Sequence, residues 1–409
     1  MQTETAKTAS PAPGGTGRLP LPALLALATA VFITSLTETL PAGVLPAMSG
    51  DLNVGEPAMG QAVTIYAIGT ALTAIPLSAA TAGWRRKRLL LTAMAAFAAA
   101  NTVTAASGDY ALTMAARFVA GVAAGVAWAL LAGYARRLAP VHLQGKAIAV
   151  VMTGIPVALS LGVPAGTFLG ELIGWRATFA VMTVLTAVLI AWIIALVPDL
   201  PGQRQGDRAP ILRALTVPGV APVLFVTLVF VLAHTILYTY VATFLERTGM
   251  GGATDLVLLV FGAASLVSIW IVGARIDRRL RVLMIAGTVL LAVAAALLAL
   301  LADGPALVYA AAALWGLGWG GVPTLLQTAV ADAGGDHADG AQAMLVTLWN
   351  VAMAGGGVVG GVLLGLFGHT SFAWSVLVLL VPVLAVVVAA RAHGFPAVRP
   401  AAGPAAVPE

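Results

Sequence analysis

Glu38 is an acidic side chain that lies deep within an apolar stretch of the sequence. The stretch runs from about residue 21 to residue 48, which exceeds the roughly 20 residues that a helix needs to cross a bilayer core. A carboxylate at that depth costs about 3 kcal/mol, and such residues usually face a bundle interior and mark proton or ion routes. The chemistry predicted for Glu38 is therefore reversible proton binding. The alternative is a carboxyl group near the outer interface, where little burial is needed.

The composition predicts an integral membrane protein. Charged residues make up 9% and hydrophobic residues 60% of the 409 residues, against roughly 25% and 45 to 50% in soluble domains. The 45 glycines favour close helix packing, because small residues let helix backbones approach each other in lipid. Cysteine is absent, which excludes disulfides and thiolate metal sites.

Apolar runs bounded by charges, Gly or Pro predict twelve membrane spans. Their ranges are 21–48, 57–82, 89–107, 110–135, 145–170, 175–197, 218–245, 254–275, 282–302, 305–331, 340–367 and 370–391. We expect a disordered cytoplasmic tail (1–19), a six-helix half (20–197), a cytoplasmic linker (198–217), a second six-helix half (218–391) and a second disordered tail (392–409). The predicted fold class is an all-α membrane protein with two pseudo-symmetric halves.

The basic residues predict the orientation of the chain. With the amino terminus inside, eighteen of the 21 Lys and Arg residues fall in inner segments, and basic loops stay cytoplasmic. Both termini are then expected in the cytoplasm. The net charge of +5 is explained by this topology, so no nucleic-acid partner is predicted.

The two halves repeat each other at an offset of 195 residues. Six glycines and one arginine of the first half recur in the second half at this offset. The matches are Gly121 with Gly316, Gly125 with Gly320, Gly145 with Gly340, Gly162 with Gly357, Gly166 with Gly361, Gly170 with Gly365, and Arg86 with Arg281. A parallel repeat of six spans is typical of transporters whose site lies at the midplane between the halves.

Two motifs resemble those found across the major facilitator superfamily. Between spans eight and nine, G-A-R-I-D-R-R-L-R resembles its inner-loop signature through Gly273, Asp277, Arg278 and Arg281; the alternative is a plain basic inner loop. In the first half Ala82 stands at the Asp position, which puts a symmetric inner latch in doubt. Span four carries R-F-V-A-G from Arg117, similar to the R-x-x-x-G pattern of that helix.

Span five carries G-V-P-A-G, with Gly162, Pro164 and Gly166, which resembles the gating motif of the antiporter branch. The stretch T-E-T-L-P-A-G-V-L-P from Thr37 resembles the first helix of the bacterial drug and sugar efflux permeases. The resemblance implies proton-coupled efflux of small apolar or amphipathic compounds across the bacterial inner membrane. The alternatives are a sugar or nucleoside efflux permease, or a non-transporting receptor or scaffold with the same fold.

The resemblance also makes spans one and four neighbours around the cavity. Glu38 lies about 10 residues, or roughly 15 Å, inside the outer end of its span, and Arg117 about 7 residues, or roughly 11 Å. We therefore predict that their side chains approach, directly or through water, in one conformation. A nearby guanidinium favours the carboxylate, whereas desolvation favours the protonated acid, so a change in their separation would act as a proton switch.

Further residues are predicted to line the substrate cavity. His234 and Tyr238 share a helix face, as do Trp315 and Trp319, because four residues separate each pair. Thr34 and Asn350 are additional candidates, and each of these side chains has packing as its alternative role.

Other chemistry finds no support in the sequence. Neither a phosphate-binding G-x-x-x-x-G-K-[ST] nor the H-E-x-x-H and G-x-S-x-G motifs of hydrolases occurs, so an enzyme is not predicted. The expected coupling ion is the proton, with no other cofactor and no metal. The expected partners are a small-molecule substrate and membrane lipid, and the expected assembly is a monomer.

Overall fold

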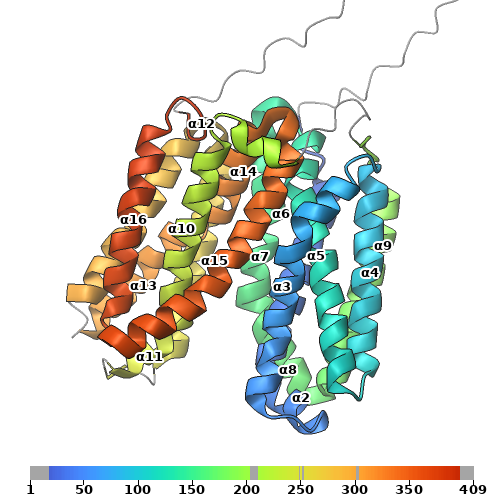
Figure 1. Cartoon of the computed structure of the whole chain (residues 1–409), viewed down its shortest axis with the longest axis horizontal. Coiled ribbons are helices and arrows are strands. Elements are labelled where there is room, and N and C mark those ends of the chain that lie inside the picture. The colour runs from blue at the N-terminus through green and yellow to red at the C-terminus, as the bar shows by residue number, and fades with distance from the viewer. Residues whose placement is uncertain (1–17, 203–210, 248, 251–252, 301–303, 397–409) are drawn as a thin grey trace, which may run out of the picture.

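The chain folds into helices that form two groups. The computed structural model describes residues 18–202, 211–247, 249–250, 253–300 and 304–396, and within them no strand occurs. Figure 1 shows the helices from α3 to α9 on one side and those from α10 to α16 on the other, in contact at one end and apart at the other. Helices satisfy their own backbone groups, which lipid requires because it offers no partner.

The first half runs from α1 to α9. Its helices are α1 (Leu21–Gly43), α2 (Leu45–Asp51), α3 (Glu56–Ala80), α4 (Arg86–Ala106), α5 (Tyr110–Leu138), α6 (Gln144–Met152), α7 (Gly154–Val157), a π-helical turn (Ala158–Gly162), α8 (Val163–Ile173) and α9 (Trp175–Leu196). Asp109 caps α5, since its carboxylate accepts a hydrogen bond of 2.8 Å from the Leu112 N–H.

The second half begins with a short 3₁₀ helix (Ile211–Thr216). It continues with α10 (Val220–Thr239), α11 (Val241–Arg247), α12 (Thr254–Leu300), α13 (Pro305–Trp319), α14 (Val322–Gly334), α15 (Ala338–Phe367) and α16 (Ser371–Ala389). Of the predicted linker, residues 203–210 lie outside the described residues.

The prediction of twelve spans is confirmed. Nine helical segments of the described residues are long and apolar enough to cross a membrane. One of them is α12, whose 47 residues would reach about 70 Å, more than twice the hydrocarbon thickness; it bends at Arg279 (φ −136°, ψ 28°) and holds two spans. The segment 305–367 likewise holds two spans, so the nine segments contain eleven spans. Span five is the twelfth, and it is not among the nine segments because it consists of the short helices α6 to α8.

The close contact between α3 and α5 depends on Gly121. A Cβ atom at Gly121 would collide with the main-chain carbonyl of Tyr66, so only glycine permits the approach. One turn further along α3, the Thr70 hydroxyl donates a hydrogen bond of 2.9 Å to the Gly121 carbonyl. At this point of the α3–α5 contact, a steric fit and a hydrogen bond therefore act together.

The second half makes the same contact between α12 and α13. A Cβ atom at Gly316 would collide with the Phe261 carbonyl, and the Ser265 hydroxyl donates a hydrogen bond of 3.3 Å to the Gly316 carbonyl. Phe261, Ser265 and Gly316 each lie 195 positions after their counterparts in the α3–α5 contact. The repeat predicted from the sequence is thus present in the packing.

The carboxyl-terminal end of the second half extends further than predicted. Phe395 is fully buried, and Gly394 packs against Gly219 at the start of α10. Both glycines have a positive φ, 91° and 96°, which L side chains rarely adopt. The boundary of the predicted disordered tail at residue 392 is therefore too early; residues 1–17 and 397–409 of the predicted tails lie outside the described residues.

Replacing Gly121 or Gly316 with alanine is expected to destabilise the protein by about 1 to 3 kcal/mol, because the new methyl group meets rigid backbone and not a movable side chain. Gly357→Ala is the matched control, since nothing lies within 4 Å of its Cβ position. Thermal unfolding of the detergent-purified variants measures the effect. Equal melting temperatures for all three variants would show that the repeated contact is unimportant.

Candidate functional site

Glu38 lies in the last turns of α1 and is half-buried. Within the part of the chain that the structure describes, its carboxylate forms no ion pair and accepts no hydrogen bond. Pro41 lies inside α1 three residues further on, where it removes a backbone donor from the helix. An acid at this depth that has no fixed partner is suited to bind and release a proton.

Arg117 of α5 lies beside Glu38 and is 0% exposed. Its Nη2 donates a hydrogen bond of 3.2 Å to the main-chain carbonyl of Glu38, and its Nε donates one of 3.3 Å to the Ala62 carbonyl. The guanidinium lies over the rings of Tyr66 and Phe179, 4.8 and 5.8 Å from their centroids. Carbonyl oxygens and aromatic faces therefore stabilise this buried cation.

The structure brings Glu38 and Arg117 together, but through the main chain of Glu38. Their side chains form no ion pair here, so the predicted direct or water-mediated approach in another conformation stays a prediction. The Arg117 Nη1 atom is buried and has no hydrogen-bond partner. This unused donor is one group that a carboxylate entering the site would satisfy.

Thr34, one turn before Glu38, does not reach open space. It is fully buried, and its hydroxyl donates to the Ala30 and Val31 carbonyls of its own helix. The Tyr66 hydroxyl donates a hydrogen bond of 3.1 Å to the Thr34 carbonyl. In this conformation Thr34 positions α1 against α3 and does not line a cavity.

In the second half, His234 of α10 is the centre of a group of aromatic side chains. The Trp315 Nε1–H donates a hydrogen bond of 3.0 Å to His234 Nδ1, and the Trp319 ring stacks on the imidazole with centroids 3.4 Å apart and planes 7° apart. The rings of Tyr238 and Phe261 lie 5.5 and 6.0 Å from it. We call these residues and Trp349, whose ring lies 5.6 Å from Trp319, the aromatic cluster.

Members of the aromatic cluster differ in exposure. Trp315 is 1% and His234 7% exposed, whereas 41% of Tyr238 is exposed. The shared faces predicted from the four-residue spacings are confirmed, because both pairs meet at His234. Asn350 of α15 bonds to the Val346 carbonyl of its own helix at 2.9 Å, which is a packing contact in this conformation.

Span five runs beside α1 and is irregular at the predicted motif. The π-helical turn ends at Gly162, and Pro164 is the second residue of α8. The Leu36 and Leu40 side chains of α1 lie against Gly162 and Gly166, where an added Cβ would be 3.2 and 2.6 Å from them. π-helical turns in α-helices are frequent at functional sites, and this one adjoins the helix that carries Glu38.

The inner-loop motif of the second half joins the two halves. The carboxylate of Asp277 accepts hydrogen bonds from the Gly145 and Lys146 N–H groups at 2.7 and 3.2 Å. These groups lie at the start of α6, where an anion is stabilised by the helix dipole. Gly273 packs on α6, with Ala149 3.2 Å from its Cβ position. Arg281 donates to the Val388 carbonyl of α16, and Arg278 is exposed.

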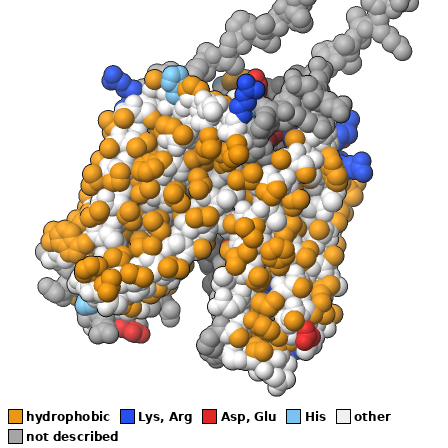
Figure 2. Space-filling view, in the orientation of Figure 1, with side chains coloured by type: hydrophobic (Ala, Val, Ile, Leu, Met, Phe, Trp, Pro, Cys, Tyr) orange, Lys and Arg blue, Asp and Glu red, His pale blue; other side chains and the backbone are white. Residues whose placement is uncertain are grey.

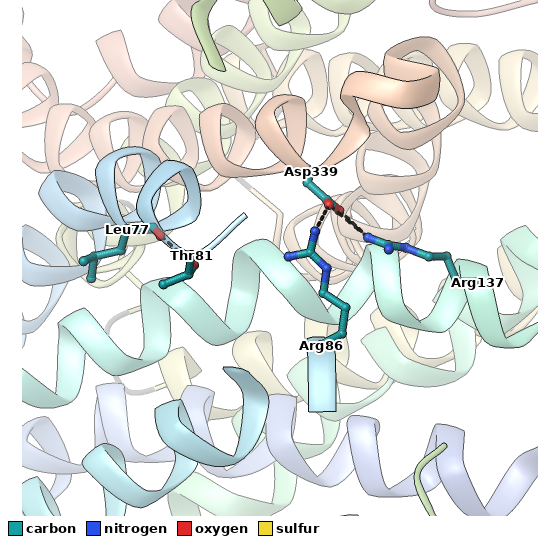
Figure 3. Close-up of polar contacts among 5 residues, drawn as sticks. All are labelled: Leu77, Thr81, Arg86, Arg137 and Asp339. Carbon is teal, nitrogen blue, oxygen red and sulfur yellow. Dashed lines mark hydrogen bonds and ion pairs between the residues drawn. The ribbon is translucent and has the colours of Figure 1, made fainter. Parts of the chain in front are cut away.

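The first half forms a latch of different chemistry. Ala82 offers no carboxylate, and Asp339 of α15 supplies the acid from the opposite half (Figure 3). Its carboxylate lies between the guanidinium groups of Arg86 and Arg137, at 2.5 and 2.8 Å. The Arg86 side chain is 3% exposed, so the ion pair is shielded from water.

Asp339, Arg86 and Arg137 were not predicted as site residues. The sequence contained one indication of this contact. Asp339 precedes Gly340, which is the repeat counterpart of Gly145, and Gly145 contacts Asp277 of the other half. A second contact of this kind is made by Arg136, which donates to the Ala331 carbonyl at 2.6 Å and lies 3.6 Å from the Asp332 carboxylate. The halves are thus closed against each other at this end.

At the other end of the first half, Asp51 ties α2 to α9. Its Oδ2 accepts a hydrogen bond of 2.9 Å from the Trp175 Nε1–H and forms an ion pair with Arg176. The Trp175 and Arg176 hydrogen bonds hold the pKa of Asp51 below its usual 3.8. The stabilisation is present above that value and is lost as the pH falls through the lower folded pKa. Proton-driven changes near neutral pH therefore do not begin at this contact.

The relatives found by comparison with characterised proteins include three from bacteria. The chain is 31% identical over 377 residues to the transcription regulatory protein OpdE of Pseudomonas aeruginosa, covering 90% of this chain and 93% of the relative. It is 33% identical over 356 residues to a chloramphenicol efflux pump of Mycobacterium tuberculosis, covering 83% and 85%. It is 28% identical over 351 residues to the purine ribonucleoside efflux pump NepI of Escherichia coli, covering 85% and 89%.

The fold is also that of solved transporters. The human organic anion transporter MFSD10 superposes with a TM-score of 0.75 at 16% identity, covering 90% of this chain and 99% of that one. The sequence profile of the Major Facilitator Superfamily matches residues 27–352. With its twelve spans in two six-helix halves and this match over most of its length, the chain belongs to the Major Facilitator Superfamily of membrane transporters.

Proposed function

We propose that the protein exports small apolar or amphipathic molecules in exchange for protons. The observation that carries the proposal is the half-buried Glu38 carboxylate, which has no partner among the described residues and lies beside the buried Arg117. Relatives that are named as efflux pumps support an efflux transporter. Proton coupling and the substrate class are the parts proposed here.

The proposed cycle alternates access to a site between the two halves. Figure 2 supports an outward-open state, with a notch between the halves at one end and Lys and Arg side chains around the other. In that state Glu38 takes up a proton from outside. A neutral acid costs less to enclose than a carboxylate, so protonation favours closure. Release of the proton inside then restores the charge, and substrate moves in the opposite direction.

Two other functions stay open to the test. A sugar or nucleoside efflux permease is favoured by the resemblance to the nucleoside pump. A non-transporting membrane receptor is favoured by the relative that is named as a transcription regulatory protein. Proteoliposomes presented with a panel of drugs, sugars and nucleosides separate the three, because a receptor releases no protons with any solute.

Glu38→Gln, which mimics the protonated acid, is expected to bind substrate with unchanged affinity and to lose proton-driven accumulation. The measurement is uphill uptake into inverted vesicles with an imposed proton gradient, beside equilibrium binding to the purified protein. Glu171→Gln serves as control, because Glu171 is an exposed acid at the end of α8. Uphill transport at the normal rate by Glu38→Gln would exclude Glu38 as the obligatory proton carrier.

The proposed orientation places the closed end in the cytoplasm. The absence of native cysteine allows a direct test with single-cysteine variants. Gly108→Cys, in the exposed turn before α5, is expected to react with an impermeant maleimide on intact cells. His142→Cys, exposed between α5 and α6, is expected to react only after permeabilisation. The reverse labelling pattern would invert the proposed topology.

Near the closed end, α14 and α15 carry buried oxygen atoms without partners. These are Thr324 Oγ1, Gln327 Oε1, Thr328 Oγ1 and Gln342 Oε1. The Gln327 amide also donates to the Met152 sulfur of the other half at 3.1 Å. Buried unpaired oxygens are costly, and separation of the halves would hydrate them. We expect this face to border the inward-open pathway.

Asp339→Asn is therefore expected to expose Thr328 to the cytoplasm. Loss of the carboxylate leaves the buried Arg86 without its counter-charge, which costs about 3 kcal/mol in the closed arrangement. N-ethylmaleimide should label Thr328→Cys at least about tenfold faster in the Asp339→Asn background, while Gly108→Cys reacts at the same rate in both. Unchanged Thr328→Cys labelling in a folded Asp339→Asn protein would show that this ion pair does not hold the halves shut.

A further inference from the structure

The imidazole of His234 is fixed on two sides by one helix. Trp315 and Trp319 are one turn apart on α13; the first donates its indole N–H to His234 Nδ1, and the second covers the face of the ring. A ring held at both its edge and its face has little freedom to rotate. Such rigid placement is what a recognition group requires.

The Trp315 hydrogen bond also fixes the tautomer of His234. An indole N–H is a donor only, so Nδ1 must accept, and an imidazole that accepts at Nδ1 carries its hydrogen on Nε2. A doubly protonated ring would lose this acceptor and set two N–H groups against each other. The arrangement is therefore compatible only with a neutral His234 that has a donor at Nε2.

The Nε2 atom makes no hydrogen bond to the described residues. It is also not one of the fully buried atoms that lack a partner, so part of its surface is accessible. His234 is 7% exposed, and the neighbouring Tyr238 is the most exposed ring of the aromatic cluster. One donor with a fixed direction, surrounded by apolar rings, is thus available to a bound molecule.

We propose that the aromatic cluster is a subsite for uncharged planar aromatic substrates, and that His234 Nε2–H donates a hydrogen bond to an acceptor oxygen or nitrogen on their ring system. This proposal rests on the proposed export function and names its substrate class. Flat rings pack on the cluster through offset or edge contacts. An ammonium group brings only donors, so it cannot accept the hydrogen bond that the Nε2–H offers.

Trp315 is then a positioning residue that acts through His234. Trp315→Phe keeps an aromatic ring but removes the hydrogen bond that fixes the His234 tautomer. His234→Phe keeps an aromatic ring and removes the Nε2–H donor. His234→Gln is the conservative variant, because its amide nitrogen can place a donor near the Nε2 position. Trp374→Phe is the matched control, since Trp374 lies exposed on α16, outside the cluster.

The test measures binding to the purified full chain and does not depend on transport. The probes are chloramphenicol and a purine nucleoside, and each is paired with an analogue that lacks one acceptor. In the first analogue an isopropyl group replaces the nitro group, and in the second a C–H group replaces N7. The wild-type protein is expected to bind at least one acceptor-bearing probe about tenfold more tightly than its analogue. His234→Phe should lose this preference, Trp315→Phe should reduce it in proportion to the lost Nε2–H tautomer, and His234→Gln and Trp374→Phe should keep it.

A spectroscopic measurement separates recognition from mere packing. ¹⁵N NMR of histidine-labelled protein, assigned with His234→Gln, should show the Nε2–H tautomer of His234 in the wild type and a mixture of tautomers in Trp315→Phe. The proposal is overturned if His234 carries its hydrogen on Nδ1, if the wild type binds no probe or makes no distinction within a pair, or if His234→Phe binds like the wild type. Binding with the expected preference but without proton release would leave the subsite intact and overturn antiport alone.

Discussion

Hydrocarbon offers no partner to a charge, and the arrangement of the first half follows from this constraint. Arg117 is fully buried, and its guanidinium is held by two main-chain carbonyls and lies over two aromatic rings. These contacts draw α1, α3, α5 and α9 to one point. Because the cation is already stabilised by groups that cannot titrate near neutral pH, the Glu38 carboxylate is not needed as its fixed counter-ion. The acid is left available for proton exchange.

The two halves use one scaffold for different chemistry. Tyr66 and Phe261 occupy equivalent positions beside equivalent glycines, yet the first lies under a guanidinium and the second beside His234 and Trp315. Beside this contact, the first half therefore places the ionisable groups Glu38 and Arg117, and the second places the aromatic cluster. This division suits a protein in which proton binding and solute binding occur on opposite walls and are joined by the movement of the halves.

Most of the fold could be predicted from the sequence, because hydropathy, charge and the repeat all report on the membrane environment. The pairs His234 with Tyr238 and Trp315 with Trp319 were found from helical spacing alone. The latch at Asp339 was not, since its partner Arg86 lies 253 residues away and only tertiary packing brings them together. The partner of Arg117 was also beyond prediction, because a sequence does not reveal whether a guanidinium meets a carboxylate or the carbonyl next to it.

The glycine contact that recurs in both halves has a consequence for how the two halves can differ. The two copies of the six-helix unit differ at the ionisable positions of the candidate site, where Glu38 and Arg117 correspond to Ala233 and Ala312. Neither copy is free to change the place where one helix backbone touches another, because any side chain there forces the helices apart. The two halves thus share the positions at which their helix backbones touch, and they differ in the side chains around those positions.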